Sequence, residues 1–505
     1  MNRPDSLIFV IFGASGDLTK RKLMPALYLL YKSGRLPRRF AVLGVARTVY
    51  DDDSFRTSIH EGLLNFIRQD EVDQDKMKAF LREVYYLSAD PSEAEAYIKL
   101  KDRLEELDRI KDNSHNYLYY LATPPLLYGI IPRHLKTAGL NREDKGFKRI
   151  IVEKPFGYDL QSAQELNRIY LDVFKEEQIY RIDHFLGKET VQNILALRFA
   201  NTVFEPLWNR NYVDYVEITA VENMGIGSRG GFYDGVGTLR DMVQNHLAQL
   251  LAVTAMEPPA VFDASGFRNE VVKVYQSLKP LSDEDIRCAV VRGQYMASEG
   301  RKGYREEEHV PFLSRTETYL AMRLELNNWR WGGVPFYIRT GKQMPTKVSE
   351  IVIHFKPAPH SMFHCGSNPC PVHNRLIIRI QPDEGVVLRL RMKKTGEGFE
   401  VLPRDMDFSY AEIGRLPTED AYARLIEDCM LGDSTLFIRS DAVEAGWRFF
   451  DSILKYWKNT PDCPLYGYPA GSWGPLEADR LIASQGASWT NPCKNLTNTH
   501  LYCEL

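Results

Sequence analysis

The fold is decided by residues 7–20, which read LIFVIFGASGDLTK. Leu7–Phe12 is an unbroken apolar run, as expected for a strand that is buried on both faces of a parallel sheet. Gly13 and Gly16 allow the backbone to turn tightly and to approach a pyrophosphate closely. A helix that begins after such a turn presents free N–H groups and a positive dipole end to an anion. The predicted dinucleotide cradle consists of Gly13, Ser15, Gly16, Asp17 and Leu18.

The surrounding pattern supports a parallel sheet. The glycine spacing differs from the standard G-x-G-x-x-G, so an ordinary glycine-rich turn is the alternative. Strand-like and helix-like runs nevertheless alternate up to about residue 182, which indicates a doubly wound sheet. Pro25 lies inside the first expected helix and leaves its start undefined, because an interior proline kinks or breaks a helix. Further strands are expected at Phe40–Val45, Val84–Leu87, Asn116–Ala122 and Arg149–Glu153.

The second part of the chain has a different pattern. Helices are expected at Lys188–Phe199 and Thr238–Met256. Runs with partial alternation and short connections rich in Gly, Pro, Asn and Asp then indicate an antiparallel sheet. We therefore predict an α/β Rossmann-type doubly wound domain over residues 1–182. An α+β domain with a large, mainly antiparallel sheet is predicted over residues 183–505.

The composition limits the class of protein. The chain has 505 residues, of which 44% are hydrophobic and 26% charged, with a net charge of −3. These values are ordinary for a globular protein and exclude a disordered, collagenous or coiled-coil chain. There is no basic surplus for nucleic-acid binding and no apolar run of roughly 20 residues for a membrane span. The first residues lack the pattern of a signal peptide, so we expect a cytoplasmic protein.

The cysteines and histidines raise the question of a metal. Seven cysteines, an odd number, are scattered through the second half, which is not a disulfide framework. His360, His364, Cys365, Cys370 and His373 offer ligand types that suit zinc. Their spacing fits no common zinc finger, so we predict a loop without metal, and a metal site is the alternative.

The end of the second expected strand indicates which dinucleotide binds. It reads GVART (residues 44–48), where an NAD site would hold Asp or Glu to bond the ribose hydroxyls. Arg47 stands at that position, and a guanidinium matches a phosphate bidentately. The sequence favours NADP over NAD, and a simple surface arginine is the alternative.

Two groups of charged residues follow later strands of the first domain. Lys154 is expected at the carboxyl end of the parallel sheet, where ligands bind, and could contact both cofactor and substrate. His184 and Lys188 could hold a phosphate, and Asp183 could orient a histidine base. The alternatives are a lysine that merely ends a strand and a solvated junction between strand and helix.

The second domain contains a further group of polar candidates: Glu222, Asp241, His246, Lys342 and Lys347. Asp241 and His246 are five residues apart in the expected helix, about 140° around an ideal α-helix. They therefore cannot share one face of a straight α-helix, and both reach one ligand only if Asp241 lies in the first turn. A structural histidine is the alternative for His246.

Together these motifs closely resemble the glucose-6-phosphate dehydrogenase family. They occur in the expected order and the resemblance covers nearly the whole chain. The matching motifs are GASGDL (13–18), EKPFG (153–157), RIDHFLGKE (181–189), RDMVQNH (240–246) and RTGK (339–342).

The resemblance implies an NADP-dependent oxidoreductase. Its reaction would oxidise D-glucose 6-phosphate at C1 to 6-phospho-D-glucono-1,5-lactone, the first step of the oxidative pentose phosphate pathway. His246 matches the family's base, and Asp183 matches the carboxylate that orients it. By the same resemblance, the phosphate ligands are His184, Lys188 and Lys347, the sugar ligands are Glu222, Asp241 and Lys342, Lys154 lies between substrate and cofactor, and Tyr128 lies near the nicotinamide.

Some features depart from the family or leave alternatives. Phe185 stands where many relatives have a tyrosine that touches the phosphate. Val387 and Trp473 replace the Tyr and Arg of relatives with a second, structural NADP, so we do not expect that second site. The resemblance implies a homodimer or homotetramer. Another sugar dehydrogenase would generally lack the RIDHFLGKE motif, and a non-catalytic NADP-binding regulator would be expected to lose His246 or Asp183.

Overall fold

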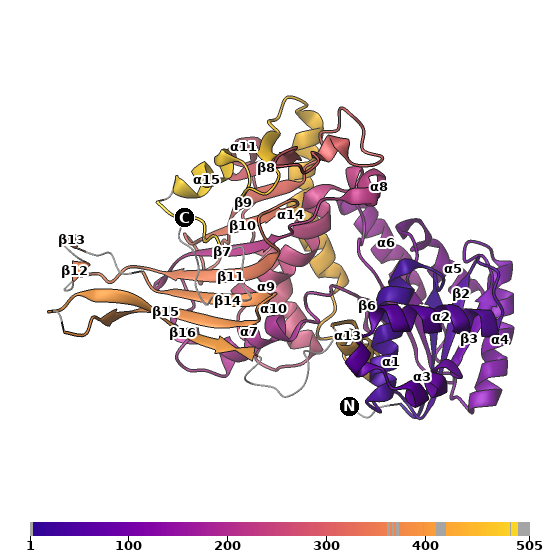
Figure 1. Cartoon of the computed structure of the whole chain (residues 1–505). Helices are drawn as coiled ribbons and strands as arrows, with labels where there is room; N and C mark the ends of the chain where they lie inside the picture. Colours follow the sequence, from indigo (N-terminus) through magenta and orange to yellow (C-terminus); the bar gives the residue numbers. More distant parts are fainter. Residues whose placement is uncertain are drawn as a thin grey trace. The chain divides into compact units, whose positions relative to one another are not determined.

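The computed structural model describes residues 4–360, 364–365, 368–369, 373–396, 398–410, 421–484 and 486–492 (Figure 1). The chain forms two compact units. Unit 1 comprises Met1–Lys188, Pro259–Asn269 and Thr418–Glu444, and unit 2 comprises Glu189–Pro258, Glu270–Pro417 and Ala445–Leu505. The predicted boundary between residues 182 and 183 stays a prediction. Cys370 and the side chains of His364 and Cys365 lie outside the described residues. The predicted loop without metal therefore stays a prediction.

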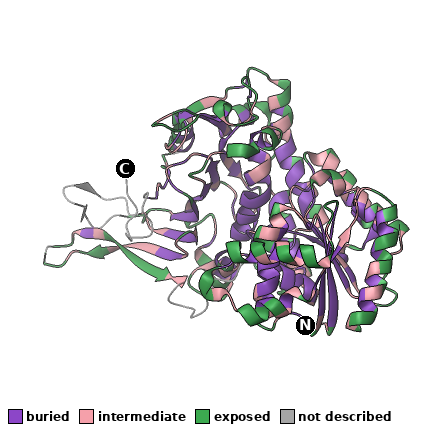
Figure 2. Ribbon diagram, turned by 45° about the vertical axis from the view of Figure 1, so that its right-hand side comes forward, coloured by how far each residue is buried: buried purple, intermediate pink, exposed green. Residues whose placement is uncertain are grey.

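Unit 1 is built on a parallel sheet of six strands in the order β3-β2-β1-β4-β5-β6. Every residue of β1 is buried, and β1 pairs in parallel with both β2 and β4. Figure 2 shows the strands of this sheet largely as buried. The strand order reverses between β1 and β4, which is where doubly wound sheets bind ligands. The α/β prediction is confirmed. The strands are β1 Ser6–Phe12, β2 Arg39–Ala46, β3 Val84–Ser88, β4 Tyr117–Leu121, β5 Lys148–Val152 and β6 Ile179–Arg181.

The structure shows where the first helix of unit 1 begins relative to Pro25. A π-helix, η1 (Thr19–Leu23), follows the glycine turn, and α1 (Met24–Lys32) then begins with Pro25 in its first turn. Proline is tolerated there because the first N–H groups of a helix lack internal partners. The other helices of unit 1 are α2 Asp52–Phe66, η2 Gln69–Glu71, α3 Gln74–Leu81, α4 Glu95–Lys111, η3 Pro125–Leu127, α5 Ile130–Thr137, α6 Leu160–Val173, η4 Glu176–Gln178 and α13 Ala421–Leu431.

Unit 2 is built on a nine-stranded sheet in the order β16-β15-β14-β11-β7-β10-β9-β8-β17. Only the β7–β10 and β8–β17 pairs of this described sheet are parallel. The predicted large, mainly antiparallel sheet is therefore confirmed. Its strands are β7 Val213–Val221, β8 Val290–Met296, β9 Tyr319–Glu325, β10 Pro335–Gly341, β11 Val348–Phe355, β14 Arg375–Gln381, β15 Gly385–Lys393, β16 Val401–Ser409 and β17 Tyr466–Pro469, and a separate pair is β12 His364–Cys365 and β13 Asn368–Pro369.

The helices of unit 2 include one long segment that is not a uniform α-helix. The predicted α-helix Thr238–Met256 is wrong in its first half, because η7 (Leu239–Leu247) is a π-helix and only α9 (Ala248–Ala255) is an α-helix. None of the described helices is both long and apolar enough to cross a membrane. The others are α7 Glu189–Phe199, η5 Glu205–Leu207, η6 Gly227–Arg229, α8 Gly230–Asp234, α11 Asp283–Ala289, η8 Tyr304–Glu306 and α15 Leu476–Ala483, while α10 Ala264–Gln276 and α14 Ser440–Asn459 begin in unit 1 and end in unit 2.

Candidate active site

The glycine turn of unit 1 is fixed by the strands on both sides of β1. Gly13 has a φ of +85°, and a Cβ there would lie 2.2 Å from the carbonyl oxygen of Ala122 at the end of β4. Its N–H donates to the carbonyl of Val45 on β2 at 2.8 Å, and its carbonyl accepts from the N–H of Gly16 at 3.0 Å. Only glycine fits this close approach. The turn thereby leaves Ser15, Gly16, Asp17 and Leu18 at least partly exposed at the ligand-binding edge of the sheet.

The cation predicted to select the cofactor lies beside this turn. Arg47 is exposed directly after β2. Its neighbour Thr48 donates a hydrogen bond from its hydroxyl to the hydroxyl of Ser15 at 2.9 Å. Asp51 is not part of this edge, because it caps α2 by accepting from the N–H of Ser54 at 2.8 Å. The residues present therefore fit a dinucleotide with an extra phosphate, because a cation stands where an acid would repel that phosphate.

A second group of charged residues in unit 1 follows strands β5 and β6, which are parallel neighbours. Lys154 comes after β5, and its peptide bond to Pro155 is cis. Asp183 comes after β6, is 2% exposed, and accepts from the N–H of Phe185 at 2.9 Å. The ammonium of Lys188 lies 4.3 Å from the ring centroid of Phe185. Phe185 thus supplies a ring face to Lys188, a favourable cation–π contact.

Two buried side chains lie near the predicted cofactor edge. Tyr128 follows η3 and is 1% exposed, and burial raises the pKa of its phenol. Its predicted place beside the nicotinamide stays a prediction. Glu153, at the end of β5, accepts a hydrogen bond from the hydroxyl of Tyr120. Burial raises the pKa of Glu153 even though this hydroxyl opposes it.

In unit 2, three predicted substrate ligands come together. Glu222 follows β7 and Lys342 follows β10, two parallel neighbours, and the N–H of Glu222 donates to the carbonyl of Gly341 at 3.0 Å. The ammonium of Lys342 donates to the carboxylate of Glu222 and lies 3.5 Å from Oδ2 of Asp241. Lys342 is 5% exposed. We call Glu222, Asp241 and Lys342 the lysine cluster.

The electrostatics of the lysine cluster favour a charged carboxylate at Glu222. Burial acts to raise the pKa of Glu222, but the ammonium of Lys342 outweighs it, and the pKa lies below its ordinary value. Lys347, which is exposed, acts in the same direction. A carboxylate that stays ionised is an acceptor for several hydroxyl groups. The cluster can therefore hold a polyhydroxylated ligand.

The π-helix changes the relation between Asp241 and His246. In η7 the backbone bonds join residues five apart, as where the N–H of Ala248 donates to the carbonyl of Val243. Residues five apart are therefore neighbours on successive turns. Asp241 and His246 share one side of η7, which an α-helix would prevent. His246 is 2% exposed.

Sequence reasoning missed two residues that support this group. The ring centroid of Tyr233 lies 5.5 Å from the ammonium of Lys342, and its hydroxyl is 2.7 Å from that of Thr238. Glu317 accepts from the N–H of Leu239, the first residue of η7. Neither belongs to a recognised motif. The only local signal for Glu317 is a short polar run before the apolar strand β9.

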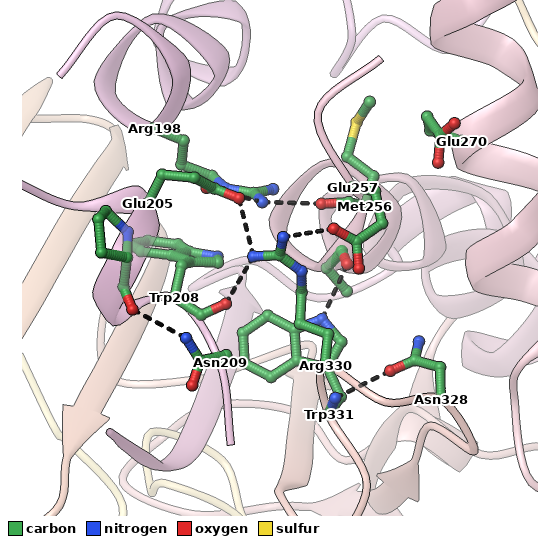
Figure 3. Close-up of polar contacts among 12 residues, drawn as sticks. Arg198, Glu205, Trp208, Asn209, Met256, Glu257, Glu270, Asn328, Arg330 and Trp331 are labelled. Atoms are coloured by element: carbon green, nitrogen blue, oxygen red, sulfur yellow. Dashed lines mark hydrogen bonds and ion pairs between the residues drawn. The ribbon is translucent and has the colours of Figure 1, made fainter. Parts of the chain in front are cut away.

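A second charged group in unit 2 lines an open hollow of about 1140 Å³, and Figure 3 shows polar contacts among its residues. We call Arg198, Glu205, Glu257 and Arg330 the arginine cluster. Arg198 is fully buried and donates to the carbonyls of three residues of the 253–256 segment and to Glu205. None of the residues lining the hollow is a predicted site residue. Because its guanidinium is saturated by the protein, Arg198 has a structural role despite the size of the hollow.

Comparison with known proteins identifies the family. Residues 10–193 match the family model described as glucose-6-phosphate dehydrogenase, NAD binding domain, and residues 195–490 match the model described as glucose-6-phosphate dehydrogenase, C-terminal domain. The chain belongs to the glucose-6-phosphate dehydrogenase family. The predicted family is thereby confirmed, and the protein is an oxidoreductase with a nucleotide-binding domain.

Individual relatives of this family match along the whole chain. Glucose-6-phosphate 1-dehydrogenase of Aggregatibacter actinomycetemcomitans is 52% identical over 494 residues, 97% of this chain and 98% of the relative. That of Treponema pallidum is 46% identical over 503 residues, 99% and 98% of the two chains. A solved structure of glucose-6-phosphate dehydrogenase in complex with its substrate glucose-6-phosphate is 34% identical, with a TM-score of 0.89 over 97% of this chain and 100% of that one.

Proposed function

We propose that this protein oxidises D-glucose 6-phosphate at C1 to 6-phospho-D-glucono-1,5-lactone with NADP. The observation that carries the proposal is the lysine cluster, in which Lys342 contacts Glu222 and Asp241 and Asp241 shares one side of η7 with His246. This is a proton acceptor next to groups that hold hydroxyls, as the oxidation of a sugar alcohol requires.

The base of the reaction is His246. Its imidazole takes the proton of the C1 hydroxyl, a role that suits a side chain with an ordinary pKa of about 6.5. Asp183 orients the imidazole and stabilises its protonated form. When bound, NADP supplies the nicotinamide C4 that accepts the hydride.

The remaining residues hold the two ends of the sugar phosphate. Glu222 and Asp241 accept hydrogen bonds from the hydroxyls, and the buried ammonium of Lys342 keeps these carboxylates in place. The cations that bind the phosphate are His184, Lys188 and Lys347, and Lys154 contacts both substrate and cofactor. A phosphate anchored at one end fixes C1 at the other, which lowers the entropic part of the barrier.

The choice of NADP over NAD is assigned to Arg47. Its exposed guanidinium follows β2, where an NAD site would hold an acid. The cradle is formed by Gly13, Ser15, Gly16, Asp17 and Leu18. R47A should raise the KM for NADP roughly 10- to 150-fold, the equivalent of about 1.5–3 kcal/mol of charged hydrogen bonding, and change the KM for NAD little. Equal changes for both coenzymes would refute this assignment.

The test of the proposed reaction is an initial-rate assay. Purified protein with glucose 6-phosphate and NADP should show rising absorbance of the reduced coenzyme. Unphosphorylated glucose is the control, and it should react far more slowly because the phosphate anchors are unused. Absence of reduction with glucose 6-phosphate would eliminate the proposed function.

We also propose that the protein forms a homodimer or homotetramer through the sheet of unit 2. Large apolar side chains of β15 and β16 are exposed, among them Met392, Met406 and Phe408, each 53–58% accessible, and Figure 2 shows the exposed residues of this edge in green. Such patches on a soluble surface mark contact sites. Light scattering of wild type and of M406K/F408K tests this, and an unchanged molar mass would contradict it. We retain the prediction of a cytoplasmic location.

A further inference from the structure

Glu317 is a buried carboxylate at the start of the helix that carries the proposed base. It lies two residues before β9 and is 6% exposed. Its Oε1 accepts from the N–H of Leu239 at 3.0 Å. Its backbone carbonyl accepts from both the N–H and the hydroxyl of Thr238, at 3.2 and 2.9 Å. Glu317 thus bonds the first two residues of this helical segment with its side chain and its main chain.

The start of η7 needs such an acceptor from outside. The first N–H groups of any helix have no partner within the helix. Thr238, at the N-cap, does not supply one from its own side chain, because its hydroxyl donates to Glu317 instead. A carboxylate at this end also interacts favourably with the positive end of the helix dipole. Glu317 therefore does the work that a capping residue of η7 itself would do.

Burial of this carboxylate is unfavourable for the fold alone. Burial raises the pKa of Glu317, and the N–H of Leu239 only partly opposes the rise. A buried carboxylate lowers stability unless its hydrogen bonds compensate for lost hydration. An apolar residue would pack here with a smaller loss of stability. The carboxylate is therefore better explained by the segments that it holds in place.

The residue after Glu317 holds the other half of the lysine cluster. The carbonyl of Thr318 accepts from the N–H of Lys342 at 2.9 Å. The hydroxyl of Tyr468 donates to the carbonyl of Lys342 at 2.7 Å and lies 3.2 Å from the hydroxyl of Thr318. The dipeptide Glu317–Thr318 therefore connects the start of η7 to the turn that carries Lys342.

We propose that Glu317 is a positioning residue that, through its bond to Leu239, holds η7 in the register that sets Asp241 beside Lys342 and His246 on the same side of η7 as Asp241. The inference rests on the proposed function, because it assigns to Glu317 the alignment of the base in that reaction. Catalysis is sensitive to such alignment, since a displacement of about 1 Å can lower a rate by about 10²-fold.

Two variants of Glu317 separate positioning from mere folding. We expect E317A to lower kcat by about 10- to 100-fold and to leave the KM for NADP unchanged, because the proposed cofactor residues belong to unit 1. E317Q retains an oxygen that accepts from Leu239, so its kcat should stay within about threefold of wild type. An E317A kcat within twofold of wild type, or an E317Q kcat as low as that of E317A, would overturn the proposal.

A matched control is available in the same unit. Glu217 is 1% exposed and bonds His354 at 2.5 Å and the N–H of Thr490 at 2.8 Å, on the sheet rather than at η7. E217A should lower the midpoint of urea denaturation and leave the kcat of the folded enzyme unchanged. If E217A lowered kcat as much as E317A, loss of any buried carboxylate would explain the result, and the proposal would be wrong.

Hydrogen exchange tests the inference without substrate. In E317A the amides of residues 239–247 should exchange faster than in wild type, whereas in E317Q and E217A they should not. Unchanged exchange in E317A would overturn the role of Glu317. If the wild type were inactive but the exchange pattern were as expected, the proposed function would be contradicted. The role of Glu317 in holding η7 would still be supported.

Discussion

The two charged groups of unit 2 differ in how far the protein itself satisfies them. In the arginine cluster, Arg198 donates to three backbone carbonyls and to Glu205, and Figure 3 shows its bond to Met256. In the lysine cluster, one ammonium faces the carboxylates of Glu222 and Asp241. An ammonium has three donors, whereas two carboxylates have about eight acceptor sites. The protein saturates Arg198, whereas the carboxylates of Glu222 and Asp241 are partly exposed and can be reached by a ligand.

This difference teaches that burial and charge alone do not identify a site. The arginine cluster lines an open hollow, yet Arg198 is engaged by main-chain carbonyls at the end of α9. Such contacts serve the helix end, where carbonyls lack partners. Changes in the arginine cluster should therefore alter stability, and changes around the lysine cluster should alter catalysis. Three variants test this division, in order of decreasing expected effect, and a fourth provides a comparison outside both clusters.

The largest effect is expected at His246. We expect H246N to lower kcat by about 10²–10⁴-fold, the usual contribution of a general base. The free energy of unfolding should change little, because asparagine keeps a polar group at this buried position. Initial rates and urea denaturation measure the two quantities on one preparation. An unimpaired H246N enzyme would remove this residue from the mechanism.

The next effect should appear in stability. R198M leaves Oε2 of Glu205 and three buried carbonyls without their Arg198 donor, while Arg330 still contacts Oε1 of Glu205. We expect a loss of about 3–5 kcal/mol in the free energy of unfolding. The kcat of the folded enzyme should not change. Denaturant unfolding at low temperature provides the measurement. A variant of normal stability with a low kcat would break the division between the two clusters.

Removal of the lysine cation should act mainly on substrate binding. We expect K342M to raise the KM for glucose 6-phosphate about 10- to 150-fold, the equivalent of about 1.5–3 kcal/mol. Stability should fall less than in R198M, because the side chains of Glu222 and Asp241 are 33% and 26% exposed and can be hydrated. Parallel kinetic and unfolding measurements compare the two variants. A larger loss of stability in K342M would reverse the comparison.

The fourth variant compares the two clusters with a carboxylate outside both of them. Asp428 of unit 1 is 4% exposed, and burial raises its pKa to about 7 although Arg424 opposes the rise. The folded state then holds a proton that the unfolded state has lost, so stability should decrease as pH rises from about 4 to about 7 and then level off.

D428N should remove that pH dependence. Because one pKa unit corresponds to about 1.4 kcal/mol, a rise of about three units corresponds to about 4 kcal/mol, and we expect D428N to be more stable than wild type at about pH 8 by up to about this amount. At about pH 4 the two proteins should be equally stable. Thermal unfolding across this pH range is the measurement. A wild-type stability that rises between these pH values would show that Asp428 is not the controlling group.

Much of the fold could be predicted from local pattern. The buried strand β1, the glycine turn and the alternation of strands and helices are local features, and they predicted the parallel sheet. The short strand β6 was not predicted, because three residues carry too little periodicity. In unit 2, β16 was also missed, since most of its residues are exposed and Pro403 and Arg404 interrupt its apolar alternation.

The candidate site was predicted less completely. The motifs named Glu222, Asp241 and Lys342 as separate candidates, and the structure joins them through the parallel pairing of β7 and β10. Standard helix geometry separated Asp241 from His246, whereas the π-helix brings them to one side. Glu317 and Tyr233 could not be found at all, because their contacts span the chain between η7 and β9 or β10.

The sequence by itself determined the doubly wound sheet, the glycine cradle and the identity of the charged candidates, because strand burial and turn formation depend on neighbouring residues. Only the tertiary structure decided which charged side chains are saturated by protein hydrogen bonds and which can be reached by a ligand. It also decided the register of η7. The physical reason is that an i→i+5 helix and an ion pair between residues 120 positions apart are stabilised by distant packing, which leaves no periodic trace in the chain.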